Sequence, residues 1–280
     1  MFVLWLLTPL TPLLLGAAYL LGLFRRESVE VDPEDYEAAS RVAARQWWLV
    51  PVLVVPTAIA PLILGVTGLP PWLHGWWRVI LPGLVGVALL WFISRLPVDK
   101  VTPGLTGRQV AWALGWIAIP LLLTIGCFLT QLVKCDVSYD ASARSFMCVV
   151  PGAEAEFAEP LLPSISDLVS LVLPALLVLF GALRMAPSRW RLVTALHASS
   201  FVAMLAGVVQ LGDLALRLEV AQNYSADGLD GAMTGIAPFP EWAVVAAELA
   251  AATVLLLALW HLGRLLVPPR LVVPVTPAPH

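Results

Sequence analysis

A small group of ionisable and amide side chains falls inside stretches of sequence that are otherwise apolar. Gln210, Asp213 and Arg217 follow one another at helical spacing, which places them on one face of a helix. Glu248 and Asp167 lie in the two neighbouring apolar stretches. A charged group inside a bilayer costs several kcal/mol, so each of these residues is a functional hypothesis. They either bind a cation or take up protons in a cavity open to the outside, or form an Asp213–Arg217 pair beside a hydrogen-bonded Glu248.

Two of the 4 histidines lie at similar depths in consecutive apolar stretches. His197 is near the start of one stretch and His261 is near the end of the next. Antiparallel helices would bring the two imidazoles level, which is the arrangement that a bis-histidine b-type haem requires. The alternative is that His261, beside Trp260, faces the lipid headgroups. No other cofactor and no metal site are predicted, since a zinc site of three histidines is improbable here.

The 3 cysteines divide into a pair and a single residue. Cys135 and Cys148 lie in one segment, residues 134–164, which the distribution of basic residues assigns to an oxidising compartment. The pair predicts a structural disulfide that closes a loop of about 14 residues and stabilises the chain by roughly 3 kcal/mol. Cys127 lies inside an apolar stretch and is predicted to be a small buried side chain.

These residues stand out because the chain as a whole is strongly apolar. Its 280 residues are 60% hydrophobic and 12% charged, whereas a soluble domain carries about 25% charged residues. The composition therefore excludes an ordinary soluble enzyme and a disordered protein. A formal net charge of -3 provides no basic field for a nucleic acid.

Seven stretches approach or meet the length of roughly 20 apolar residues that a helix needs to cross a bilayer. They cover residues 2–24, 49–69, 79–93, 110–133, 165–183, 192–216 and 242–265. We therefore predict an all-α polytopic bundle of seven transmembrane helices over residues 1–266. A proline-rich cytoplasmic tail, residues 267–280, follows it and is expected to be extended or disordered.

Basic residues set the predicted orientation, because short loops rich in Lys and Arg stay in the cytoplasm. Most of the 16 basic residues fall in alternate loops, which predicts an extracytoplasmic N-terminus and a cytoplasmic C-terminus in a cell membrane, inner or plasma. Most of the 12 tryptophans lie near the ends of the stretches, while Trp5 and Trp116 lie several residues further in. The tryptophans are interpreted as anchors at the headgroup level rather than as a ligand cage.

Two local patterns predict contacts around the bundle. Asp32 as N-cap and Pro33 in the first turn predict an amphipathic connector helix over residues 32–47, either a docking site for a cytoplasmic partner or a plain connector. Small residues recur every four positions in the last two spans: Ser199, Ala203, Gly207, Ala247 and Ala251. Such rows let two helices of one chain, or of two membrane proteins, approach closely.

No family is assigned to the chain. The last stretch has no lysine for a retinal Schiff base, and nucleophile-elbow, HExxH, GxGxxG and P-loop patterns are missing from the sequence. An enzyme is therefore less expected than a non-enzyme. The leading interpretation is a non-catalytic subunit or scaffold of a membrane complex. The alternatives are a proton- or cation-coupled transporter of small solutes and a haem-bearing electron-transfer subunit.

Overall fold

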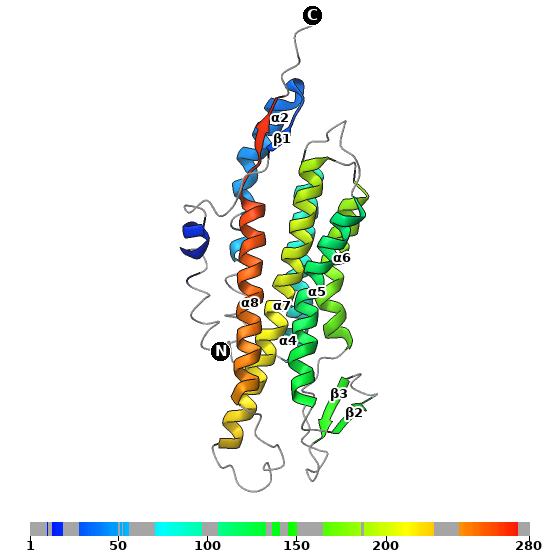
Figure 1. Cartoon of the computed structure of the whole chain (residues 1–280), viewed down its shortest axis with the longest axis vertical. Coiled ribbons are helices and arrows are strands. Elements are labelled where there is room, and N and C mark those ends of the chain that lie inside the picture. The colour runs from blue at the N-terminus through cyan, green and yellow to red at the C-terminus, as the bar shows by residue number, and fades with distance from the viewer. Residues whose placement is uncertain are drawn as a thin grey trace, which may run out of the picture.

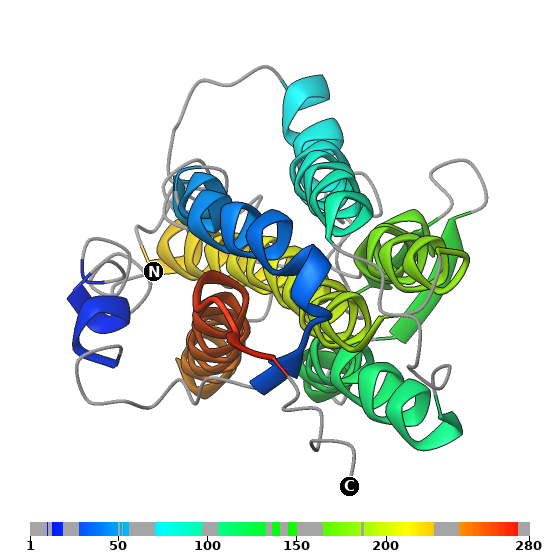
Figure 2. The same ribbon diagram turned by 90° about the horizontal axis from the view of Figure 1, so that it is seen from above.

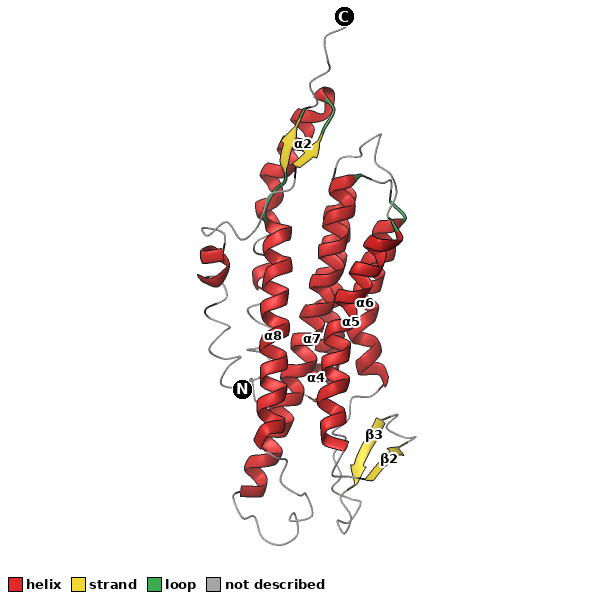
Figure 3. Ribbon diagram, viewed as in Figure 1, coloured by secondary structure: helices red, strands yellow, loops and turns green. Residues whose placement is uncertain are grey.

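The fold is an elongated, mostly helical bundle (Figures 1 and 3). The computed structural model describes residues 10, 13–18, 28–49, 51, 53–55, 71–96, 106–132, 136–140, 145–149, 165–185, 188–226 and 241–273. Most of the first two predicted spans, 2–24 and 49–69, lies outside the described residues, so the count of seven stays a prediction. The class is not purely helical, since two small two-stranded sheets accompany the bundle.

Three described helices are long and apolar enough to cross a membrane, which makes this a membrane-embedded protein. They are α5 (Gly107–Leu132), α7 (Arg189–Ala226) and α8 (Glu241–Leu266). Two others, α4 (Pro71–Arg95) and α6 (Ile165–Leu183), contain shorter apolar helices. α7 spans 38 residues, or about 57 Å, so it continues well past the end that was predicted for the sixth span.

α7 is the central helix of the bundle. It contacts α8, α6, α5 and α4, and Figure 2 shows it in the middle of the bundle, with α8 on one side and α4 on the other. Within its apolar part, Arg189–Ala215, 94% of the most apolar window is buried, compared with 56% for α8 and 22% for α5. α7 is therefore enclosed by protein, whereas much of α5 and α8 lies on the surface of the bundle.

Small residues allow the helices to approach closely. A Cβ atom at Gly207 of α7 would lie 2.5 Å from the Cβ atom of Pro120 on α5 and 3.1 Å from Cγ1 of Val254 on α8. At Gly207, the small-residue row of α7 therefore lets α5 and α8 pack closely against it. α4 and α6 meet in the same way, since a Cβ atom at Gly181 would lie 3.0 Å from Cδ2 of Leu90.

Large apolar side chains cover the outer surfaces of three helices. On α4 they recur at helical spacing at Leu84, Val87 and Trp91, which are 62%, 66% and 63% exposed. α6 and α8 carry similar exposed rows, namely Val169, Leu173, Leu177, Val245, Leu249 and Leu256. Lipid or an apolar partner must cover these faces, because exposing contiguous apolar patches of this kind to water is unfavourable.

At one end of the bundle, which we call the tail end, segments from both halves of the chain meet. Strand β1 (Ser28–Glu30) pairs in parallel with β4 (Arg270–Val272), so part of the predicted tail is an extended strand. Residues 274–280 lie outside the described residues, so the prediction for the rest of the tail stays a prediction. The strand forms because the pairing supplies backbone partners, such as the bond from Val31 N–H to the Val272 carbonyl at 3.0 Å.

The predicted connector is present as three consecutive helical pieces. These are the 3-10 helix η1 (Pro33–Asp35), α2 (Tyr36–Arg45) and the 3-10 helix η2 (Gln46–Trp48). Asp32 occupies the N-cap position, but its side chain makes no capping hydrogen bond. The Asp32 carbonyl instead accepts the N–H of Asp35 at 3.0 Å, as the tighter 3-10 turn requires.

At the opposite end, which we call the hairpin end, two strands form an antiparallel pair. β2 (Asp136–Asp140) and β3 (Ser145–Val149) place Val137 opposite Cys148. Cys135 lies outside the described residues, so its disulfide with Cys148 stays a prediction. Cys127 is half-buried and packs against an apolar cluster that α7 and α8 share.

The close approach at Gly207 predicts a loss of stability in the variant Gly207→Ala. The added methyl group would overlap the ring of Pro120, which cannot rotate away, and overpacking of this kind costs about 1–3 kcal/mol. The measurement is thermal unfolding of the purified protein in detergent. Gly115→Ala on α5 is the matched control, because nothing lies within 4 Å of a Cβ atom there. Equal stability of the two variants would show that the helices do not meet closely at Gly207.

Candidate functional site

The structure brings the two predicted histidines into direct contact. His197 of α7 and His261 of α8 are 8% and 0% exposed, and their Nδ1 atoms lie 3.1 Å apart. At this distance one Nδ1 donates a hydrogen and the other accepts it, so the two rings hold complementary tautomers. The alternative that His261 faces the lipid headgroups is wrong, because α7 and Trp-bearing helices enclose the ring completely.

Three tryptophans surround this pair. Trp112 and Trp116 come from one face of α5, and Trp260 comes from α8. The ring centroid of His261 lies 4.8 Å from that of Trp116 and 4.7 Å from that of Trp260, with both pairs edge to face. The His197 centroid lies 5.6 Å from that of Trp112. We call these five residues the histidine–tryptophan cluster.

The cluster leaves one ring nitrogen of His261 without a conventional partner. Its Nε2 atom is buried and has no hydrogen bond within the described part of the chain. When His261 accepts through Nδ1, its Nε2 must carry the hydrogen of the neutral ring. The electron-rich faces of the surrounding tryptophans are the neighbours suited to that N–H group.

Sequence reasoning assigned Trp112 to the membrane interface, placed Trp116 several residues further in, and missed the contact of both with the histidines. A usable signal was present in the spacing of four residues between them, which puts both on one face of a helix. Trp112 and Trp116 also lie about as far from the start of α5 as His197 lies from the start of α7. Trp112 is 39% exposed. Its side chain can therefore lie at the membrane interface and also contact the histidine rings.

In this arrangement the two histidine rings contact each other directly, and the haem hypothesis stays a prediction. Two nitrogens on opposite sides of one iron lie about 4 Å apart at metal–nitrogen bonds of about 2 Å, and a flat macrocycle must pass between the rings. The observed Nδ1 atoms are 3.1 Å apart and in hydrogen-bond contact. Among the described residues, no three His, Cys, Asp or Glu side chains gather as a metal site would require.

The predicted acidic cluster lies toward the other end of α7. Gln210 is 7% exposed and donates from Nε2 to Oγ of Ser170 on α6 at 3.3 Å, while Asp213 is 9% exposed. Next to Asp213, Leu214 packs in one cluster with Ala247, the residue before Glu248. The structure thus brings Asp213 and the half-buried Glu248 to one layer of the α7–α8 pair.

The remaining members of that prediction are only partly described. Arg217 belongs to α7 and Asp167 to α6, but their side chains lie outside the described residues. The predicted ion pair between Asp213 and Arg217 therefore stays a prediction.

An apolar segment of α7 separates the two polar sites. His197 and Asp213 are 16 residues apart in one helix, or about 24 Å. Residues 201–209 between them are all apolar and buried. The histidine–tryptophan cluster and the acidic layer are therefore separate sites along α7.

The histidine contact predicts that substitutions of the two rings are strongly non-additive. His197→Leu or His261→Leu alone should cost about 1–3 kcal/mol of unfolding free energy, because each leaves one buried imidazole without its partner. The double variant should cost less than the sum of the two, since no orphaned ring remains. Unfolding of all four proteins in the same detergent measures this coupling. Additive costs would show that the rings do not interact.

No protein-family model matches this chain, and no curated protein or solved structure shows significant similarity to it.

Proposed function

We propose that this protein is a structural subunit of a membrane complex, with its central helix held in place by buried hydrogen bonds. The supporting observation is that buried polar side chains join different elements. His197 links α7 to α8, Gln210 links α7 to α6, and Gln46 of η2 donates from Nε2 to the carbonyl of Leu265 on α8. Each of these groups therefore contributes to helix association.

A fourth link fastens the tail end of α7 to α4. Arg191 donates from Nε to the carbonyl of Leu96 at 2.9 Å and from Nη2 to that of Ser94 at 3.2 Å. These carbonyls lie at the end of α4, where the last turn of a helix has no partner of its own. Arg191 of α7 therefore caps the end of α4 and holds the two helices together.

The exposed apolar rows offer the surface for assembly. α4, α6 and α8 present contiguous large side chains to the exterior, and helices of a second protein would pack there by shape. The proposal includes seven spans, a cytoplasmic tail end, and a disulfide between Cys135 and Cys148 at the extracytoplasmic hairpin end. The distribution of Lys and Arg supports this orientation.

Purification from native membranes in mild detergent tests the subunit proposal. We expect a second polypeptide to co-purify in a fixed molar ratio, detected by mass spectrometry of the intact assembly. An unrelated tagged multi-pass protein from the same membranes is the control for adventitious partners. A single chain without a stoichiometric partner would contradict the proposal. The absorption spectrum of the same sample tests the haem hypothesis, since the absence of a Soret band would eliminate it.

A second candidate function, proton- or cation-coupled transport of a small solute, is favoured by the acidic layer. Asp213 and Glu248 lie at one level of the α7–α8 pair, and two carboxyl groups at one depth can bind a cation or exchange protons. The long apolar segment of α7 toward the tail end weighs against a path along this helix. We therefore rank transport second.

The variant Glu248→Gln distinguishes the two functions. If the acidic layer carries protons, this nearly isosteric change should abolish proton flux in vesicles that contain the purified protein, since an amide cannot exchange the proton. Glu37→Gln, on the exposed surface of α2, is the matched control and should leave the flux unchanged. Equal flux from the wild type and Glu248→Gln would remove the transport candidate.

A further inference from the structure

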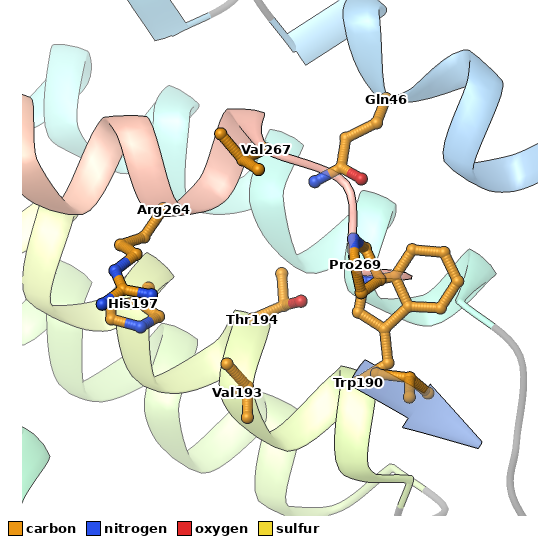
Figure 4. Close-up of a pocket in the computed structure, with 9 residues that line it drawn as sticks. Gln46, Trp190, Val193, Thr194, His197, Arg264, Val267 and Pro269 are labelled. Carbon is orange, nitrogen blue, oxygen red and sulfur yellow. The ribbon is translucent and has the colours of Figure 1, made fainter. Parts of the chain in front are cut away.

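A small cavity with both polar and apolar lining residues lies at the tail end, where α7, α8 and the segment before the second predicted span meet. Figure 4 shows its wall, to which Gln46, Trp190, Thr194, His197 and Arg264 contribute. The cavity has a volume of about 40 Å³, which corresponds to about three water molecules. It is separate from the acidic layer and borders the histidine–tryptophan cluster through His197.

The cavity combines hydrogen-bond donors with one unsatisfied acceptor. Arg264 and Thr194 bring donor groups to its wall. Gln46 is 3% exposed, and its Nε2 is engaged with the Leu265 carbonyl. The remaining amide oxygen, Oε1, is buried and has no hydrogen-bond partner within the described part of the chain. A buried acceptor of this kind calls for a ligand or water that donates to it.

The charge of the wall is positive. The Arg264 side chain brings a guanidinium group to it, and no acidic residue is among the described residues that line the cavity. The guanidinium carbon of Arg264 also lies 5.6 Å from the centroid of Trp260, which fixes its position beside the cavity. A cation is therefore disfavoured, and an oxyanion is the complementary ligand.

The inferred ligand must satisfy both requirements at once. It needs oxygens that accept from Arg264 and Thr194, and a hydroxyl or ammonium group that donates to Oε1 of Gln46. The free oxygens of a phosphoryl group would take the place of the few waters that a cavity of this size holds. Basic pockets between membrane helices on the cytoplasmic side are also a known location for anionic lipid headgroups.

We propose that this cavity binds a phosphoryl oxyanion that carries a hydrogen-bond donor, supplied either as free hydrogen phosphate or as the headgroup of a lipid such as phosphatidylglycerol. Bound there, the group bridges η2 to α7 and α8 and fastens the tail-end segments onto the bundle. The proposal is independent of the structural-subunit function, since a transporter would use the same site equally well.

Binding to the full chain in lipid nanodiscs tests this proposal. The probes are nanodiscs of phosphatidylcholine alone, the same nanodiscs with added phosphatidylglycerol, and inorganic phosphate in solution. Phosphatidylcholine has the phosphate but no donor in its headgroup, so it is the matched lipid control. We expect phosphatidylglycerol or phosphate to raise the midpoint of thermal unfolding in a saturable manner. Native mass spectrometry of the released protein should show about one bound phosphoryl group per chain.

Three variants connect that effect to the cavity. Thr194→Val removes one donor with little change in shape, and Arg264→Gln removes the charge; each should weaken binding roughly tenfold. Arg95→Gln removes an exposed arginine of α4, whose guanidinium lies over Trp91, and should bind as the wild type does. Because Arg264→Gln could also reduce folding, Thr194→Val and the mass measurement keep the test decisive.

Each outcome is informative. An effect of phosphatidylglycerol alone assigns the site to a lipid headgroup, and an effect of phosphate alone assigns it to the free anion. The proposal is overturned if phosphatidylcholine acts like phosphatidylglycerol while phosphate has no effect, because the cavity then holds water only. It is also overturned if Arg95→Gln loses as much binding as Arg264→Gln, since a diffuse surface charge would then explain the affinity.

Discussion

A helix that is buried on every side must find partners for its polar side chains on its own backbone or on the helices around it, because neither water nor lipid reaches them. α7 is in this position, and its neighbours are arranged accordingly. Ser199 and Ser200 of α7 donate to the Leu196 carbonyl of the same helix, whereas its longer polar side chains reach other helices. His197 meets His261 of α8 at one end, and Gln210 meets Ser170 of α6 toward the other. These two contacts fix both the depth and the rotation of the adjoining helices. The positions of the other elements therefore depend on how α6 and α8 pack against α7.

Apolar packing alone would not specify that arrangement. Lipid tails compete for apolar side chains as well as a protein helix does, so close backbone approach and hydrogen bonds decide which helices associate. Gly207 provides the close approach to α5 and α8 in the segment that separates the two polar contacts. Along its length, α7 thus has a hydrogen-bonded contact at each end and a close helix approach between them. Moving a neighbouring helix by one turn along α7 would break these contacts.

The sequence indicates those features that depend on local pattern. Hydropathy locates the apolar parts of α5, α7 and α8, and the small-residue row locates the close approach at Gly207. The level of the two histidines follows from counting residues along consecutive helices. The length of α7 does not follow, because polar residues after Leu216 resemble a loop. The helix nevertheless continues to Ala226, since Ala, Leu, Glu and Gln in that segment are good helix formers.

Contacts between the two ends of the chain are harder to predict. Gln46 and Leu265 are 219 residues apart in sequence, and β1 and β4 are three-residue strands without a strong alternating pattern. No local rule pairs such segments, because their partners are chosen by where the long helices bring them. The contact of Trp112 and Trp116 with the histidines was missed for the same reason, since these residues lie far apart in the sequence. A tryptophan near a helix end satisfies interface anchoring and helix packing equally, so composition does not separate the two.

The tail end joins the bundle by apolar packing and by hydrogen bonds. Val29, Val31 and Ala39 are buried in the same core cluster as the bundle helices. β1 pairs with β4, and Gln46 of η2 donates to the Leu265 carbonyl of α8. A ligand that binds only when η2, α7 and α8 are together stabilises that arrangement in proportion to the logarithm of its concentration over its dissociation constant. The small cavity between them is the place where such a ligand would act on all three at once. Its wall includes the buried Oε1 atom of Gln46, which has no hydrogen-bond partner within the described part of the chain, so a ligand that donates to it would join η2 to the two helices.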